Sequence, residues 1–147
     1  MIYLLDTMVT TELTRDATRR NRNVAAWIHG VDATDLATSA LVVREMWDGL
    51  VAMRADHRKA SRAAEAERRI KNLLDTFDDR ILPVDRAVAI DWAELLPGHS
   101  KRSVDVGIAA TARVHGLVVV TRNMKDFVGL GARVIDPFQS PPAEYSP

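Results

Sequence analysis

The stretch SVDVGIAATARVHGLVVVTRN, residues 103–123, decides how this chain folds. Its first part, Ser103–His115, consists largely of small residues and predicts a helix, and Gly116 is a typical residue to end one. The run that follows, Leu117–Thr121, is the most strand-like segment of the chain. A helix followed at once by a buried strand predicts one unit of an α/β fold.

The same alternation extends from this stretch to both ends of the chain. Further strands are predicted at Met1–Leu5, Asp35–Ser39, Ile81–Val84 and Arg133–Ile135, and further helices at Asn21–His29, Ala40–Met53, Asp56–Asp79 and Asp85–Leu96. Strands that alternate with helices predict a parallel sheet with helices on both faces. We therefore expect a three-layer α/β/α protein with about five short parallel strands, and the two helices over residues 40–79 are expected to form a helical hairpin.

Length and composition indicate one ordinary globular unit. The chain has 147 residues, and 47% of them are apolar, which fits a single domain with a normal core. We expect that domain over residues 1–138 and a loose, Pro-rich C-terminal tail over residues 139–147. The absence of cysteine excludes disulfides, zinc–thiolate sites and thiol nucleophiles, and it favours a cytoplasmic protein.

The charge balance is neutral, with 20 basic and 20 acidic residues. This argues against broad, non-specific affinity for nucleic acid, which usually accompanies a positive excess. A nucleic-acid enzyme stays compatible with it if an acidic pocket offsets a basic rim. No signal-peptide pattern is visible, and apolar runs such as Leu117–Val120 are too short to span a bilayer, so no membrane association is expected.

Four acidic residues occupy the positions where a parallel sheet binds ligands, beyond the carboxyl ends of its strands or on the helices that follow them. They are Asp6, Glu45, Asp105 and Asp126. Glu45 points along the core-facing stripe of its helix, where a carboxylate is costly unless it is paired or coordinates a metal. A small drift in the helix face would instead let it reach solvent.

Each acid taken alone has an ordinary structural explanation. Asp105 is a favourable charge at a helix N-terminus, Asp126 can start a turn, and Asp6 can cap the helix after it. Together, however, four carboxylates in one place cannot all stay ionised without a cation. Oxygen ligands without a Cys or His cluster indicate Mg²⁺ or Mn²⁺, and such a site can activate water to attack a phosphodiester.

Several motifs resemble, in order and spacing, the PIN-domain nucleases, and most of all the VapC toxins of type II toxin–antitoxin systems. They are LLDT at 4–7, SALVVREMWDGL at 39–50, VDVGIAATARVHGL at 104–117 and VVTRNMKDF at 119–127. The segment FDDRILPVDRAVAIDWAEL at 77–95 also resembles the part of those toxins between the second and third acids. The resemblance covers nearly the whole chain, up to about Phe138.

The resemblance implies a PIN-like fold with a protruding helical hairpin and an endoribonuclease that uses one or two Mg²⁺ or Mn²⁺ ions. The metal ligands and catalytic acids would be Asp6, Glu45, Asp105 and Asp126. Thr7, Ser39, Thr121 and Asn123 match polar positions that hold the acids or the attacking water, although each hydroxyl alone is most simply a cap or turn residue. The implied partners are an RNA substrate, a small VapB-like antitoxin and a second copy of the chain in a homodimer.

One position departs from the family pattern. Met8 stands where the family usually has Asn or Ser, and it removes a polar contact close to the expected metal, so we expect lowered or altered metal affinity. A non-toxin PIN nuclease of RNA processing and a catalytically weakened PIN binding module both remain alternatives. An aspartyl phosphatase is excluded, because it would need a second Asp where Met8 stands.

The hairpin offers a surface for partners. The resemblance places the antitoxin in a groove near Ala40–Asp79, with a basic side chain pushed into the acidic pocket. Apolar anchors for it could come from Met46, Trp47, Leu50 and Met53, although Met46 and Leu50 are better explained as core. The basic residues Arg54, Arg58, Arg62, Arg68 and Arg69 are either RNA contacts or a solvated face with ion pairs to Glu65 and Glu67.

Overall fold

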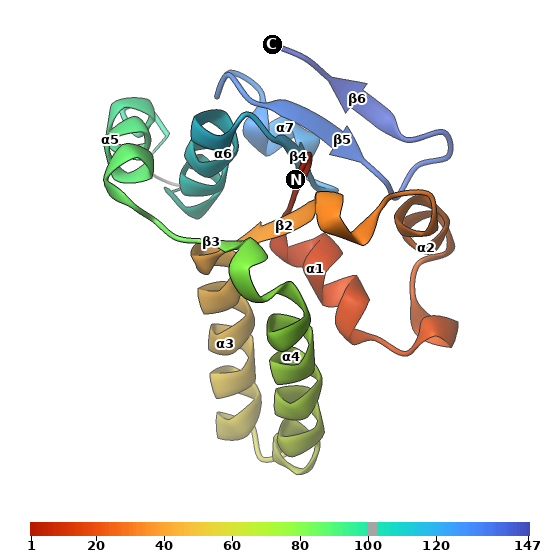
Figure 1. Cartoon of the computed structure of the whole chain (residues 1–147). Helices are drawn as coiled ribbons and strands as arrows, with labels where there is room; N and C mark the ends of the chain where they lie inside the picture. Colours follow the sequence, from red (N-terminus) through yellow and green to blue (C-terminus); the bar gives the residue numbers. More distant parts are fainter. Residues whose placement is uncertain (100–102) are drawn as a thin grey trace.

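A six-stranded sheet runs through the centre of the protein (Figure 1). The structure is a computed structural model, and it describes residues 1–99 and 103–147. The strands are β1 (Tyr3–Leu5), β2 (Leu36–Ser39), β3 (Ile81–Leu82), β4 (Val118–Val120), β5 (Arg133–Asp136) and β6 (Ala143–Tyr145). Their order is β3-β2-β1-β4-β5-β6, and only β6 is antiparallel to its neighbour.

Helices connect the strands and cover both faces of the sheet. They are α1 (Thr7–Thr14), α2 (Arg22–His29), α3 (Ala40–Ala55), α4 (Ala63–Phe77), α5 (Arg86–Leu95), α6 (Ser103–His115) and α7 (Met124–Phe127). Short 3₁₀ turns lie at Ala17–Arg19, Ala33–Asp35, Ala60–Arg62 and Asp78–Arg80. In the part of the chain that the structure describes, no helix is both long and apolar enough to cross a membrane.

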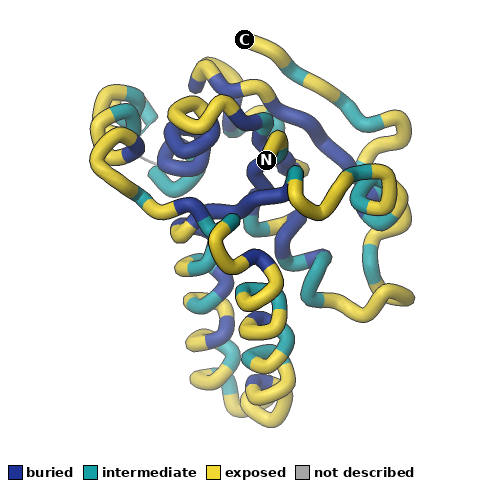
Figure 2. The backbone as a smooth tube through the Cα atoms, in the orientation of Figure 1, coloured by how far each residue is buried: buried dark blue, intermediate teal, exposed yellow. Residues whose placement is uncertain are grey.

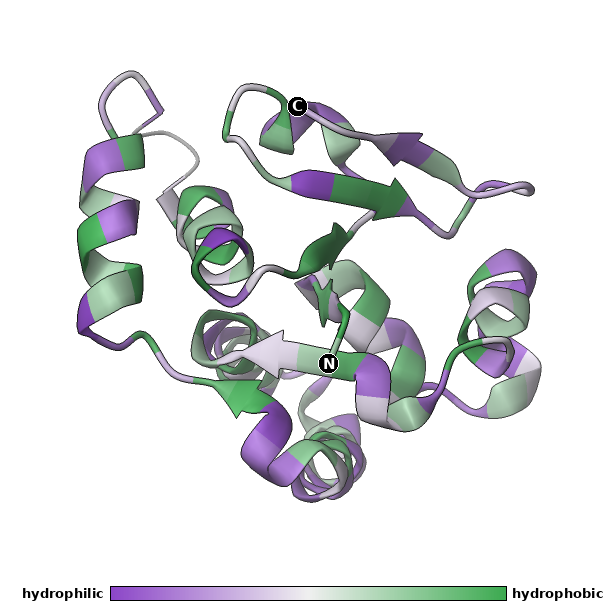
Figure 3. Ribbon diagram, turned by 45° about the horizontal axis from the view of Figure 1, so that its top comes forward, coloured by the Kyte–Doolittle hydropathy of each residue, from purple (hydrophilic) through white to green (hydrophobic). Residues whose placement is uncertain are grey.

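Adjacent residues of each central strand serve opposite faces, because side chains alternate along a strand. Leu4 lies in the core formed with α3, α5, α6 and α7, whereas its neighbour Leu5 lies in the core formed with α1 and α2. Figure 2 shows the central strands buried, and Figure 3 shows their hydrophobic character. This confirms the expected three-layer α/β/α architecture.

The expected helical hairpin is present and points away from the sheet (Figure 1). Its second arm begins later than predicted. Residues 56–62 form the turn between the arms, because the Asp56 carboxylate accepts a hydrogen bond from the backbone N–H of Arg58 (3.0 Å) and holds the chain in a bend. The regular helix α4 starts only at Ala63.

Two predictions about strands need correction. The tail over 139–147 is not loose throughout, because Ala143–Tyr145 pairs with the free edge of β5 and adds a sixth strand. The prolines that suggested a loose tail, Pro141 and Pro142, precede this strand and leave its backbone N–H groups intact. Strand β3 is shorter than the predicted Ile81–Val84 and ends at Leu82, before Pro83, which has no N–H to donate.

Candidate active site

Asp6 lies at the carboxyl end of β1, in the middle of the sheet. Its backbone N–H donates to the carbonyl of Val120 in β4 (3.0 Å), so the two strands end side by side. One carboxylate oxygen, Oδ2, accepts a hydrogen bond from the Thr121 hydroxyl (2.6 Å), and the other, Oδ1, accepts from the backbone N–H of Thr7 (2.6 Å). Asp6 is only 5% exposed, so both of its oxygens are fixed inside the protein.

The surroundings of Asp6 disfavour its charge. Burial raises the pKa of Asp6 above its ordinary value, and the nearby charges of Glu45 and Asp126 raise that pKa further. The hydrogen bonds from Thr121 and Thr7 lower it but do not cancel the rise. A cation beside Asp6 would relieve this unfavourable charge.

Thr7 connects two of the predicted acids. Its backbone N–H binds Asp6, and its hydroxyl donates to Oε2 of Glu45 on α3. Glu45 is half-buried, so it lies between the two positions considered from sequence, neither in the core nor freely in solvent. Asp6 also caps the N-terminus of α1, so the ordinary explanation and the predicted site apply to the same residue.

The structure relates the other two acids to Asp6 to different degrees. Asp126 is on α7, directly after β4, and its charge acts on Asp6. Asp105 is half-buried in the first turn of α6, a helix that packs against α3. The residues just before this helix, 100–102, lie outside the described part of the chain, and the place of Asp105 beside the other acids stays a prediction.

Two further predicted polar residues act through the backbone. Ser39 is fully buried and caps α3, where its hydroxyl accepts from the N–H of Val42 (3.3 Å). It therefore supports the helix that carries Glu45. The backbone N–H of Asn123 donates to the hydroxyl of Thr121 (3.0 Å). This contact fixes the orientation of the hydroxyl that donates to Asp6.

The donor chemistry of the site fits a hard divalent cation, because carboxylate oxygens are the ligands that Mg²⁺ and Mn²⁺ prefer. In the described part of the chain, the carboxylates nevertheless do not lie close enough together to form a complete set of metal ligands. Within residues 1–99 and 103–147, no three acidic or histidine side chains lie close enough to hold a metal ion as they stand. Asp6 is the fixed member of the group, and Glu45 and Asp126 influence it through their charges.

A groove of about 690 Å³ starts at Thr7 and Glu45 and continues along the hairpin. Its apolar wall includes Met46, Leu50, Met53 and Ile70, and its basic residues are Arg15, Arg19, Lys59, Arg62 and Arg69. Met46 and Leu50 are buried in the core, as favoured from sequence, but they also reach the groove wall. Trp47 lies beneath Arg54 and Lys71, which stand 5.9 and 6.0 Å from its ring centroid.

Most arginines of the hairpin form local ion pairs. Arg54 pairs with Glu67, and Arg68 and Arg69 both pair with Glu65. The two arginines lower the pKa of Glu65 to about 2. The solvated, ion-paired face is therefore confirmed for these three arginines. Arg62 and Lys59 form no ion pair within the described residues, so their charges remain available to a ligand in the groove.

Two buried acids, Glu12 and Asp136, were not predicted from the sequence. Glu12 on α1 is 6% exposed, accepts a hydrogen bond from the N–H of Asn21 (2.8 Å) and pairs with Arg15 (2.8 Å). It fixes the segment between α1 and α2. Its position three residues before Arg15 was the only available signal, and that spacing is common on exposed helices.

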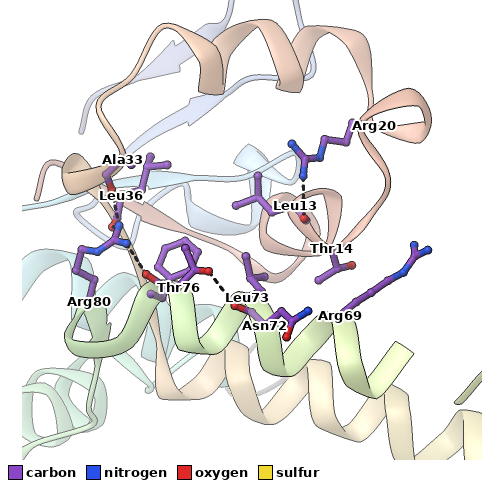
Figure 4. A pocket seen from close by; sticks show the side chains of 11 residues that line it. Leu13, Thr14, Arg20, Ala33, Leu36, Arg69, Asn72, Leu73, Thr76 and Arg80 are labelled. Atoms are coloured by element: carbon purple, nitrogen blue, oxygen red, sulfur yellow. Dashed lines mark hydrogen bonds between the residues drawn. The ribbon is translucent and has the colours of Figure 1, made fainter. Parts of the chain in front are cut away.

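Another cavity of about 400 Å³ lies farther along α4, toward its C-terminus, shares Thr14 and Arg69 with the groove and contains none of the four acids (Figure 4). Arg20 donates to the carbonyl of Leu13 (3.1 Å), and Arg80 donates to the carbonyls of Leu36 (2.9 Å) and Thr76 (2.7 Å). These arginines join loops to helices, so we assign them a structural role.

Known proteins resemble this chain along most of its length. A model of the PIN domain matches residues 3–128. The toxin FitB of Neisseria gonorrhoeae is 34% identical over 142 residues, which cover 93% of this chain and 99% of that protein. The VapC ribonuclease Y4jK of Sinorhizobium fredii is 32% identical over 143 residues, which cover 94% and 99%.

Solved structures agree with these similarities. The crystal structure of FitAcB from Neisseria gonorrhoeae gives a TM-score of 0.78 at 31% identity, and the match covers 94% of this chain and 99% of that chain. A structure of FitAB bound to a DNA fragment gives a TM-score of 0.76 at 31% identity, with 94% and 96% covered. These findings confirm the resemblance inferred from the sequence motifs.

Proposed function

Because the chain belongs to the PIN domain family, we propose that it is a divalent-metal-dependent endoribonuclease and the toxin of a type II toxin–antitoxin pair. The observation that carries this proposal is Asp6, buried at a central strand end, held by Thr121 and Thr7, and subject to the charges of Glu45 and Asp126. The names of the relatives, a toxin and a VapC ribonuclease, support the same activity.

The proposed ligands for Mg²⁺ or Mn²⁺ are Asp6, Glu45, Asp105 and Asp126. The bound ion would lower the pKa of water and stabilise negative charge on the phosphodiester. The hydrogen bonds from Thr121 and Thr7 fix the orientation of the Asp6 carboxylate, and the Thr7 hydroxyl also restrains the carboxylate of Glu45. Arg19, Lys59 and Arg62, which have no ion-pair partner within the described residues, would contact the flanking phosphates of the RNA.

The proposed partner is a small antitoxin, because the similar FitB chains are solved as FitAB and FitAcB assemblies. An antitoxin helix would lay apolar side chains against Met46, Leu50, Met53 and Ile70 in the hairpin groove. A bound antitoxin would then cover the basic residues that RNA needs, so inhibition would follow from competition. A homodimer of the toxin is part of this proposal.

The test compares the unmodified protein with four variants, Asp6→Asn, Glu45→Gln, Asp105→Asn and Asp126→Asn. Asp75→Asn serves as the matched control, because Asp75 is exposed on α4. Each protein is expressed in a bacterial host without an antitoxin, and new RNA 5′ ends are mapped. The purified proteins are also incubated with RNA in Mn²⁺ and in a chelator.

We expect growth arrest and discrete new 5′ ends with the unmodified protein and the control, and neither with the four variants. Cleavage in the chelator would contradict the metal dependence, and an active Asp105→Asn protein would contradict the role of that residue. Cleavage in vitro without growth arrest would favour an RNA-processing nuclease over a toxin.

A further inference from the structure

A second pocket, of about 410 Å³, adjoins the hairpin groove along α1 and shares Thr7, Thr11, Arg15 and Arg19 with it. Four segments form it: α1, the turn before α2, the end of β4 and the chain just after β5. Its lining residues are Thr7, Met8, Thr11, Glu12, Arg15, Arg19, Asn21, Arg122 and Phe138. We call it the Phe138 pocket. Thr7 lines it and also holds Glu45, so a ligand in the pocket would adjoin the proposed catalytic acids.

The charge of the Phe138 pocket suits an anion. Three arginines line it, Arg15, Arg19 and Arg122, against one acid, Glu12. Arg15 neutralises Glu12 through their ion pair. Within residues 1–99 and 103–147, Arg19 and Arg122 form no ion pair, so two uncompensated positive charges face the space beside the site.

Phe138 is held firmly at one wall of the pocket. Its N–H donates to Oδ1 of the buried Asp136 (2.9 Å), and its carbonyl accepts from the side-chain amide of Asn23 (2.6 Å). The guanidinium carbon of Arg122 stands 5.1 Å from the centroid of its ring. Together the two side chains form a prepositioned aromatic and cationic surface, the kind on which nucleobases stack in single-stranded nucleic acid complexes.

Met8 adds an apolar, polarisable side chain to the same pocket. It is 37% exposed and lies on the first turn of α1, one residue after Thr7. From sequence, Met8 was expected to weaken the metal site by replacing a polar residue. Its place in the pocket wall gives it a different role, because a thioether packs well against flat aromatic groups.

We propose that the Phe138 pocket binds the nucleotide adjacent to the scissile phosphodiester of single-stranded RNA. The base stacks on the surface formed by Arg122 and Phe138 and contacts Met8, and Arg19 meets the phosphate. We expect the strand to be unpaired there, because a base in a duplex would first have to give up its pairing and stacking before it could stack on the protein. This inference rests on the proposed nuclease function, since it names how that site holds its substrate.

The experiment measures RNA binding separately from cleavage. The unmodified protein is titrated into a fluorescein-labelled oligoadenylate of about eight nucleotides in the presence of a chelator, and binding is followed by fluorescence anisotropy. The variants are Phe138→Leu, Arg122→Ala and Arg122→Lys. The control is Arg86→Ala, because Arg86 is an exposed arginine at the start of α5, outside both the groove and the pocket.

We expect Phe138→Leu and Arg122→Ala to weaken binding by about tenfold, as the loss of one stacking contact does, and Arg86→Ala to leave binding unchanged. Arg122→Lys keeps the charge but loses the planar guanidinium, so it should bind nearly as weakly as Arg122→Ala. Arg122 is exposed, so its variants test the proposal even if Phe138→Leu disturbs the fold.

The outcomes separate this proposal from the nuclease proposal. If the unmodified protein cleaves RNA in Mn²⁺ but the Arg122 variants bind the oligonucleotide like the unmodified protein, the pocket assignment is overturned and the nuclease function stands. If binding falls as expected but Mn²⁺ produces no cleavage, the pocket stands as a binding site for single-stranded RNA, whereas the nuclease function and the position next to a scissile phosphodiester are overturned. If the unmodified protein does not bind the oligonucleotide at all, the pocket assignment is overturned.

Discussion

The hydroxyl of Thr121 donates a 2.6 Å hydrogen bond to the carboxylate of Asp6, although 115 positions separate the two residues in the chain. They meet because β1 and β4 are parallel neighbours that end together. The bond is one of two that lower the pKa of Asp6 against the opposing effect of burial. It therefore favours the ionised carboxylate that a metal needs.

Replacing Thr121 with valine tests this contact, because valine has nearly the same shape without the hydroxyl. In Thr121→Val, the pKa of Asp6 should rise further, and Mn²⁺ affinity should fall by about 10–100-fold, as for other lost partners of metal ligands. Isothermal titration with Mn²⁺ would measure the change. The control is Thr111→Val, which removes a buried hydroxyl that donates to the carbonyl of Gly107 within α6. Equal affinities in the two variants would contradict the role of Thr121.

Asp6 should also destabilise the metal-free protein at neutral pH. Burial raises its pKa in the folded state above the ordinary value of 3.8. Each unit of that rise corresponds to about 1.4 kcal/mol lost on ionisation. In chelator at neutral pH, we expect Asp6→Asn to have a higher thermal midpoint than the unmodified protein, because the amide carries no charge.

The pH dependence follows from the same shift. Between pH 3.8 and the raised pKa, the folded protein keeps a proton that the unfolded chain has released, so stability falls as pH rises through this window and then levels off. The advantage of Asp6→Asn should therefore disappear when the pH is lowered through that window. Asp75→Asn, an exposed control, should track the unmodified protein at every pH. An advantage that does not change with pH would contradict this account.

Glu12 should contribute to stability more than a surface acid does. Glu12→Ala leaves the N–H of Asn21 without its buried acceptor and Arg15 without its partner, which should lower the free energy of unfolding by about 1–3 kcal/mol. Urea denaturation followed by circular dichroism would measure it. Glu94→Ala, on the exposed side of α5, should change the free energy by much less, and similar losses in both variants would contradict the assignment.

Two helical glycines should respond to alanine in opposite directions. A Cβ on Gly107 would stand 2.5 Å from Cδ1 of Leu41 and 3.0 Å from the Trp92 ring, whereas a Cβ on Gly49 would meet nothing within 4 Å. Gly107→Ala should therefore cost about 1–3 kcal/mol through overpacking, and Gly49→Ala should gain about 0.5–1 kcal/mol. Thermal unfolding of both variants would show shifts of opposite sign, and a stabilised Gly107→Ala would contradict the tight α3–α6 contact.

Sequence was sufficient for the features that local patterns control. The apolar run before Asp6 and the run from Leu117 to Thr121 indicated two buried parallel strands, and polar residues at their ends indicated where a site would form. Helix α6 begins and ends at the predicted residues, Ser103 and His115. The spacing of apolar residues and the residues that begin and end a helix are local features, so the sequence alone is enough to locate these elements.

Features that depend on distant partners were missed. Strand β6 forms because β5 has a free edge with which it can pair, and no local pattern in Ala143–Tyr145 predicts that pairing. The Phe138 pocket assembles from four separate segments, so neither the contact of Arg122 with Phe138 nor the position of Met8 could be read from spacing. The hydrogen bond from the N–H of Asn21 to Glu12 could not be predicted either, because it depends on how the chain folds back between α1 and α2.

The separation of β1 from β4 in the chain also determines when the proposed site can form during synthesis. A ribosome adds about 5–20 residues per second, so Asp6 leaves the ribosome several seconds before the strand that must lie beside it. Until β4 is made, Asp6 lacks both its neighbouring strand and the Thr121 hydroxyl. A nascent chain therefore cannot hold the proposed site in its complete form, and we expect a short interval during synthesis in which the emerging protein has no nuclease activity.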